Sequence, residues 1–287
     1  MSEASANQFL ALGDFSRQDF IHGNPESLIQ AEDHPKVLVL WPHGDETLGP
    51  DVGYHIYTER SELLTHVDYM CGNPLAANHQ PALRHTVGIT DGYEAEGTDL
   101  NRSFTPGVPP KSYEQHRAPL IMATIEQGGY DYVLDLHTTF TPGGRYFLIS
   151  ERFIAEPAVR AMIAASPINR VVVMPDKIAR DGLIGNCDRS VSIEYSRPLA
   201  GRTGVRDTMM LIDGLVSGQS AVSPHKRELF YVTNVIPKDN DPGLEARNFQ
   251  LCKDGYYPIL FGEKGYRDDP TKKYLGFAAT TKEIITL

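Results

Sequence analysis

Residues that can bind a metal ion lie near the ends of two apolar segments of the chain. His43 and Glu46 come shortly after the β-branched run at 37–40, and His137 ends the alternating segment YDYVLDLH. Two imidazoles and a carboxylate, with one coordination position left for water, are typical of catalytic rather than structural zinc. Because α/β sheets bind their ligands at the carboxyl ends of buried strands, both histidines are well placed. The sequence therefore predicts one zinc ion per chain, bound by His43, Glu46 and His137.

Two further carboxylates could support this metal chemistry. Glu194 lies within SVSIEYS, whose apolar and β-branched residues indicate a largely buried strand, where a charged residue is seldom present for stability. It is the predicted base that takes a proton from water and returns it to the leaving nitrogen. An exposed edge strand with Glu194 facing solvent is the alternative. Asp135 shares a strand face with His137, where it could fix the tautomer of that histidine or cap a turn.

Composition and charge limit the classes of protein to which the chain can belong. With 287 residues, 41% hydrophobic and 22% charged, it should fold as one large domain or as a large and a small one. Its net charge of -10 argues against a nucleic-acid partner. The three widely spaced cysteines favour a reducing compartment. Because no signal peptide or membrane span is recognisable, we expect a cytoplasmic protein without a membrane partner; a homo-oligomer is compatible with all of this.

Short apolar strands alternate with helices over most of the chain, from residue 37 to about residue 215. The expected strands are VLVL, HVDYMC, YDYVLDLHTT, RYFLIS, RVVVM and SVSIEYS, and helices are expected at about 50–64, 113–127, 156–165 and 205–215. This order predicts an α/β fold in which a sheet is flanked by helices on both faces. The long segment 73–110 is rich in Gly, Pro, Asn and His, and loops of this length are usually functional.

The pattern of alternating strands and helices ends near residue 217, which suggests a second domain. Residues 1–217 would form the catalytic domain, after a polar lead-in at about 1–35. Residues 218–287 carry the segments ELFYVTNVI, YYPILF and EIITL, which look like strands without intervening helices. We expect them to form a small β-rich domain that covers the mouth of the active site.

Several motifs, taken in order, resemble the succinylglutamate desuccinylase and aspartoacylase family, which is related to the zinc carboxypeptidases. These are HGDE, an Asn-Pro pair, DLNRSF, DLHTT, an isolated strand glutamate and the terminal GEKGY followed by FAATTKE. The resemblance covers roughly residues 36–287 and implies a carboxypeptidase-like mixed sheet. It also implies roles for the matching residues. These are His43, Glu46 and His137 as zinc ligands, Asn101, Arg102 and Tyr266 as substrate contacts, Glu194 as base, and Glu263 at the cavity mouth.

The chain departs from the family pattern at three places. Glu94 occupies the position of an arginine that polarises the scissile carbonyl, a role that passes to Arg84 if 85–98 is an insertion. Ser196 and Arg197 replace the Gly-Pro that follows the catalytic glutamate. The arginine that would bind the substrate carboxylate is left open among Arg180, Arg189 and Arg197.

The motifs together predict a zinc-dependent amidohydrolase that cleaves the N-acyl bond of a small, anionic and acidic N-acyl amino acid. A carboxypeptidase acting on short peptides is the alternative among enzymes. The departures near Glu194 and Arg84 also leave room for a relative that binds metal or ligand without catalysis.

Overall fold

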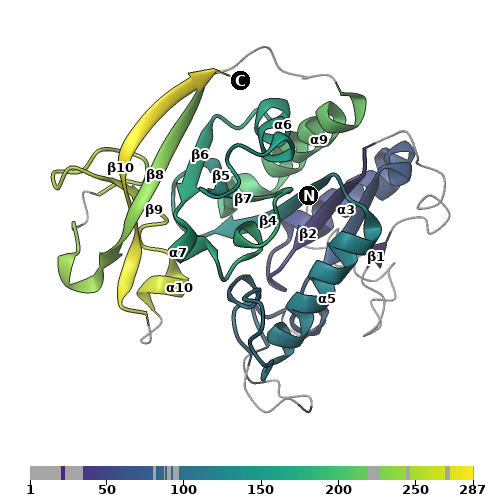
Figure 1. The fold of residues 1–287 in the computed structure, drawn as a ribbon, viewed down its shortest axis with the longest axis horizontal. Helices are drawn as coiled ribbons and strands as arrows, with labels where there is room; N and C mark the ends of the chain where they lie inside the picture. Colours follow the sequence, from purple (N-terminus) through teal and green to yellow (C-terminus); the bar gives the residue numbers. More distant parts are fainter. Residues whose placement is uncertain are drawn as a thin grey trace.

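A computed structural model describes residues 21–22, 35–79, 82–86, 88, 92, 97–218, 226–243, 246–268 and 272–286. Within these ranges ten strands form one mixed sheet in the order β1-β3-β2-β4-β7-β5-β6-β8-β10-β9 (Figure 1). The strands are β1 (Ile21–His22), β2 (Val37–Trp41), β3 (Val67–Cys71), β4 (Tyr132–Thr139), β5 (Arg145–Ser150), β6 (Arg170–Met174), β7 (Ser190–Ser196), β8 (Lys226–Pro237), β9 (Tyr257–Ile259) and β10 (Tyr274–Thr286). Apart from β1, the predicted lead-in lies outside the described residues.

Helices occupy the connections between most of the strands. The longer helices are α3 (Leu48–Glu59), α5 (Tyr113–Gly128), α6 (Pro157–Ala165) and α9 (Arg202–Ser217). The short ones are α4 (Pro74–Ala77), α7 (Asp176–Ala179), α8 (Arg197–Ala200) and α10 (Lys264–Arg267), with 3-10 turns η1 (Ser61–Thr65), η2 (Leu100–Arg102), η3 (Leu183–Gly185) and η4 (Lys238–Asn240). None of the helices in the described residues has the length and apolar character needed to cross a membrane.

The sheet combines parallel and antiparallel strands, as the predicted mixed sheet requires. Strands β3, β2, β4 and β7 run parallel to one another, whereas β1 is antiparallel to β3 and β5 is antiparallel to β7. All five residues of β2 and all seven of β7 are buried, as expected for strands covered on both faces. The pairing of His137 on β4 with Glu194 on β7 sets the two residues side by side across the sheet.

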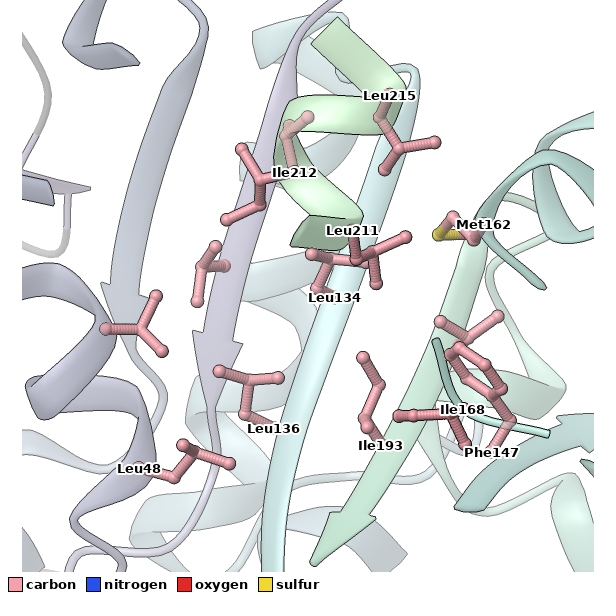
Figure 2. Packing of buried hydrophobic residues seen from close by; sticks show 14 of the residues in the cluster. Leu48, Leu134, Leu136, Phe147, Met162, Ile168, Ile193, Leu211, Ile212 and Leu215 are labelled. Carbon is pink, nitrogen blue, oxygen red and sulfur yellow. The ribbon is translucent and has the colours of Figure 1, made fainter. Parts of the chain in front are cut away.

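Two apolar layers fix the helices on opposite faces of the sheet. Helices α3, α6 and α9 pack on one face, where Leu211, Ile212 and Leu215 of α9 contact the layer that contains Leu134 and Leu136 of β4 (Figure 2). Helix α5 packs on the other face, against the alternate residues of β2. Since successive residues of a strand point to opposite faces, strands covered on both faces need apolar residues at successive positions, as β2 has throughout and β4 has at Val133 and Leu134.

The C-terminal strands continue the same sheet. Strand β8 pairs in parallel with β6, and β10 joins β8 and β9 in antiparallel fashion, so this part lies at the opposite end of the sheet from β2 (Figure 1). Within the segment EIITL, residues 283–286 prove to be only the end of β10, which begins at Tyr274. The expectation of strands without helices was also wrong, because α10 precedes β10. The proposed domain boundary falls at the end of α9, and the division into two domains stays a prediction.

Candidate active site

His43, Glu46 and His137 lie together at or just beyond the carboxyl ends of β2 and β4. One ligand atom from each can be chosen so that all lie within 4.8 Å of one another, and all three residues are buried. Nδ1 of His43 is 2.8 Å from Oε1 of Glu46, and Nδ1 of His137 is 3.8 Å from Oε2. That Oε2 atom is buried without a hydrogen-bond partner among the described residues. An orphaned carboxylate oxygen between two imidazoles is suited to a divalent cation.

Nε2 of each histidine lies within hydrogen-bond distance of an aspartate. Nε2 of His137 is 2.8 Å from Oδ2 of Asp135, which also accepts a hydrogen bond from the Ser192 hydroxyl. Nε2 of His43 is 3.1 Å from Oδ1 of Asp99. With Nε2 of each ring facing an aspartate, the Nδ1 atoms face Glu46, which is how metal-ligand histidines are usually oriented. Asp135 therefore lies where the sequence placed it, whereas the part played by Asp99 was missed.

The charges of this group are strongly coupled. Burial opposes the charged form of Glu46, but His43 and Arg84 lower its pKa to about 2. Burial likewise acts against the charged form of His137, but Asp135 raises its pKa to about 10. In the metal-free molecule the carboxylates thus keep a proton on this imidazole. A bound cation would take the place of that proton.

A second group of potential ligands shares His43. It consists of His43, His85 and Asp99, with the rings of the two histidines 5.4 Å apart between centroids. Within it, Nε2 of His43 is already 3.1 Å from Oδ1 of Asp99. The first group fits a metal better because each of its imidazoles has an Nδ1 atom turned to Glu46 and an Nε2 atom turned to an aspartate.

Glu194, on β7, lines one cavity together with His43 and His137, and it is 8% exposed. Burial is the main cause that raises its pKa, to about 7; His137 opposes the shift and Glu46 adds to it. A carboxylate in this state can both accept and release a proton near neutral pH. The exposed edge strand considered as an alternative is wrong for Glu194, because β7 lies between β4 and β5.

Arg84 reaches the metal ligands from the long loop. Its Nη1 donates to Oε1 of Glu46 at 2.8 Å and lies 4.0 Å from Asp45. The close approach depends on Gly44, where a Cβ atom would stand 2.4 Å from the backbone nitrogen of Ala77 and 2.5 Å from the carbonyl oxygen of Leu83. Only glycine lets the loop pack against the HGDE turn in this way.

The remaining predicted substrate contacts line the same cavity, which has a volume of about 530 Å³. Asn101 and Arg102 form the turn η2, and Nη1 of Arg102 donates to the carbonyl oxygen of Asn101 at 2.7 Å. Tyr266 arrives from α10, and burial raises the pKa of its phenol, which therefore stays a hydrogen-bond donor. Lys272, which the sequence did not single out, also lines the cavity.

Glu114 holds the two ends of the long loop together, a role that the sequence did not suggest. This carboxylate is fully buried on α5. It accepts hydrogen bonds from the Asn73 side chain, from the backbone nitrogen and hydroxyl of Thr86, and from the backbone nitrogen of Thr98. Thr86 follows Arg84 by two residues, and Thr98 precedes Asp99. Glu114 therefore positions the segments that carry the loop residues of the cavity.

The C-terminal segment is fastened to the strand that carries His137. The Glu263 side chain accepts hydrogen bonds from the Thr139 hydroxyl and from the backbone nitrogen of Phe140, at 2.9 Å from the latter. The Phe140 ring stacks against Arg197 of α8 and Lys264 of α10, with the cationic groups 3.7 and 4.3 Å from its centroid. These contacts hold Tyr266 at the cavity wall.

The arginines proposed for the substrate carboxylate lie elsewhere. Arg180, Arg189 and Arg197 are absent from the cavity lining in the described part of the chain. Arg197 instead donates to Asp45 at 2.8 Å, and Arg189 donates to Asp188 and to the carbonyl oxygen of Tyr130. Their spacing along the sequence gave no sign of these partners.

Comparison with known proteins relates this geometry to solved structures. No known family model matches the sequence, and no curated protein sequence does. Murine aminoacylase 3 superposes with a TM-score of 0.62 at 16% identity, covering 88% of this chain and 96% of its own. Succinylglutamate desuccinylase from Chromobacterium violaceum gives 0.62 at 14% identity and 98% coverage of both chains. An aspartoacylase family protein from Mesorhizobium loti gives 0.50 at 17% identity, covering 88% of this chain and 82% of its own.

The chain has the aspartoacylase and succinylglutamate desuccinylase fold. The fold expected from the motifs is thereby confirmed, and the match extends into the C-terminal strands because the desuccinylase covers nearly the whole chain. At identities this low the similarity establishes the fold alone, so the chemistry must be argued from the side chains described above.

Proposed function

We propose that this protein is a zinc-dependent hydrolase that cleaves the N-acyl amide bond of a small N-acyl amino acid. The observation that carries the proposal is the position of Glu194, a buried carboxylate that lines one cavity together with His43 and His137, two members of the group His43, Glu46 and His137 that could hold a metal ion. The fold shared with acylases and desuccinylases supports the same reaction class.

The proposed ligands are His43, Glu46 and His137, and their donor set fits zinc. Zinc, when bound, lowers the pKa of a coordinated water towards about 7 and polarises the scissile carbonyl. Asp135 and Asp99 keep the Nδ1 atoms of the two imidazoles turned towards Glu46, so that these three residues would hold the ion. Losing either aspartate should therefore weaken metal binding without removing a ligand.

Glu194 is the proposed base and acid. Its raised pKa, about 7, lets it take a proton from the attacking water and then give that proton to the amide nitrogen as the C–N bond breaks. The products are a free carboxylate from the acyl group and a free amine on the amino acid. One side chain thus serves both proton transfers, and the cavity needs no second acid.

The cationic side chains of the cavity are the proposed anchors for the carbonyl and the carboxylate. Arg84, beside Glu46, is placed to stabilise the developing oxyanion, and Arg102 offers a planar guanidinium for a carboxylate. Asn101 and Tyr266 can donate further hydrogen bonds. A carboxypeptidase is less well supported, because Tyr266 and Lys272 of the C-terminal segment line the cavity and leave room for small ligands only.

The test is metal analysis combined with a hydrolysis assay. The purified protein should contain close to one zinc per chain, and it should release amine from N-acyl amino acids added as a panel. Chelation should abolish the activity, and added zinc should restore it. A protein that binds the panel and zinc but releases no amine under any of these conditions would be a binding protein, and the proposal would fail.

A further inference from the structure

We propose that the substrate has a single carboxylate and that its variable part is apolar, in contrast to the acidic substrate expected from the motifs. This inference rests on the proposed function and specifies its substrate class. It follows from the composition of the cavity beyond the metal ligands.

One wall of the cavity is made of aliphatic and aromatic side chains. They come from β5, β6, α7, η3, β10 and the residue after β9, and all pack in or against one hydrophobic cluster. These residues are Leu148, Met174, Ile178, Ile184, Leu260 and Phe277. A carboxylate placed here would lose its hydration without gaining a donor, whereas an alkyl or aryl group would gain buried contact area.

The charges of the cavity provide for one carboxylate. Arg84 is already paired with Glu46 at 2.8 Å. Arg102 and Lys272 remain as cations of the lining. Glu263 lines the same cavity, and no salt bridge joins it to a lysine or arginine in the described residues. Glu263 offsets one of these two cations, so the lining keeps one positive charge for a substrate carboxylate, and a second carboxylate would meet the apolar wall.

The arginines that could have added positive charge to the cavity lie outside its lining. Arg180, at 68% side-chain exposure, points to Asp181, and Arg197 is bound to Asp45. The site of an acidic side chain should contain such a cation in a fixed position. Within the described lining, an apolar surface occupies the space instead.

Two pairs of nearly isosteric compounds test the inference. N-acetyl-leucine and N-acetyl-aspartate differ in the side chain, and 4-methylpentanoyl-glycine and succinyl-glycine differ in the acyl group. We expect the apolar member of at least one pair to have a kcat/KM at least about 10-fold higher than its acidic partner. Faster hydrolysis of the acidic member in both pairs would overturn the inference and leave the proposed function standing.

Binding provides a readout that does not depend on catalysis. The Glu194→Gln variant, loaded with zinc, can be titrated calorimetrically with the same four compounds. The same order of affinities is expected. If hydrolysis is absent in the wild-type protein but the apolar compounds bind the variant more tightly, the proposed function fails and the substrate class survives. Tighter binding of the acidic compounds, or binding of none of the four, rejects the inference.

Ile178→Lys introduces an ammonium group into the apolar wall. Because Ile178 is only partly buried, the longer side chain can be accommodated. The variant should lower kcat/KM for N-acetyl-leucine and raise it for N-acetyl-aspartate, each by about 10-fold. Leu251→Lys, at a position 61% exposed and outside the cavity lining, makes the same change in net charge and should alter neither. Equal shifts in both variants would mean a general charge effect and would contradict the proposal.

Discussion

The proposed metal ligands and the proposed substrate contacts are carried by different kinds of structure. His43, Glu46, His137 and Glu194 lie on or within a few residues of the buried central strands β2, β4 and β7. Arg84, Arg102 and Tyr266 lie on a long loop, a 3-10 turn and a four-residue helix. The first set is oriented by neighbouring strands, whereas the second depends on a few side-chain hydrogen bonds.

The difference suggests that the two sets can be perturbed separately. Changes among the strand-borne residues should affect metal content or turnover, because these residues are the proposed ligands and the proposed base. Changes among the loop-borne residues should affect substrate affinity and leave the zinc in place. Each prediction below tests that separation.

The largest effect is expected for His137→Ala. Removing one of three ligands should lower zinc content to less than one-tenth per chain and turnover by at least about 1,000-fold, since a bound ion stabilises several kcal/mol of transition-state charge. Metal analysis and amine release measure the two quantities. His55→Ala on α3, whose histidine pairs with Glu59 away from the cavity, should retain both. Full zinc content in His137→Ala would remove this residue from the ligand set.

Glu194→Gln should lower turnover by at least about 100-fold, because the amide cannot accept the proton from water. Zinc content and substrate affinity should stay within about twofold of the wild type. Glu59→Gln, at a position with 60% side-chain exposure, serves as the matched control. A Glu194→Gln enzyme with nearly normal turnover would show that another group moves the proton.

Tyr266→Phe should raise KM more than it lowers kcat. A hydrogen bond to a charged group contributes about 1.5–3 kcal/mol, which corresponds to roughly 10- to 150-fold in affinity. The ring would keep its packing against Tyr274 and Phe277, at centroid distances of 5.0 and 5.6 Å. Tyr274→Phe in the same aromatic group lies outside the cavity lining and should leave KM unchanged. Unaltered KM together with a lower melting temperature would assign Tyr266 a packing role only.

Glu114→Gln should have the smallest catalytic effect and a clear effect on stability. The new amide cannot accept from all of its donors, and each buried group left unpaired costs about 1–3 kcal/mol. We expect a lower melting temperature and a several-fold higher KM at constant zinc content, because the loop shifts while the strands do not. Glu126→Gln, exposed on the same helix, is the control. Loss of zinc in Glu114→Gln would break the separation between the two sets.

What could be predicted from the sequence follows the same division. The strands β2, β4 and β7 were recognisable because burial on both faces requires continuous apolar runs. Their polar exceptions, His137 and Glu194, were therefore conspicuous. Helix α5 was also predictable, since Ser112 and Gln115 form a capping box and Gly129 ends it in the left-handed conformation.

The loop contacts could not be predicted, for physical reasons. Glu114 looks like an ordinary helix-surface glutamate, and its partners lie 16 to 41 residues away along the chain. Asp99 gave no indication that it would reach His43, 56 residues distant. The C-terminal segments were expected to form a separate domain because they look like strands without intervening helices, and the sequence carries no mark of the pairing between β8 and β6. Such contacts depend on tertiary placement rather than on a local pattern.

The pairing of β2 with β4 also bears on the order in which the molecule forms. Lys36, just before β2, donates to Asp131, just before β4, although 95 residues separate them. Contacts between such distant segments form slowly, because the entropy cost of closing a long loop comes before the strand pairing can stabilise it. During synthesis His43 and Glu46 emerge from the ribosome well before His137, and Glu194 follows later still. The proposed zinc ligands are therefore complete only after nearly half of the chain has been made, and metal uptake should be a late step of folding.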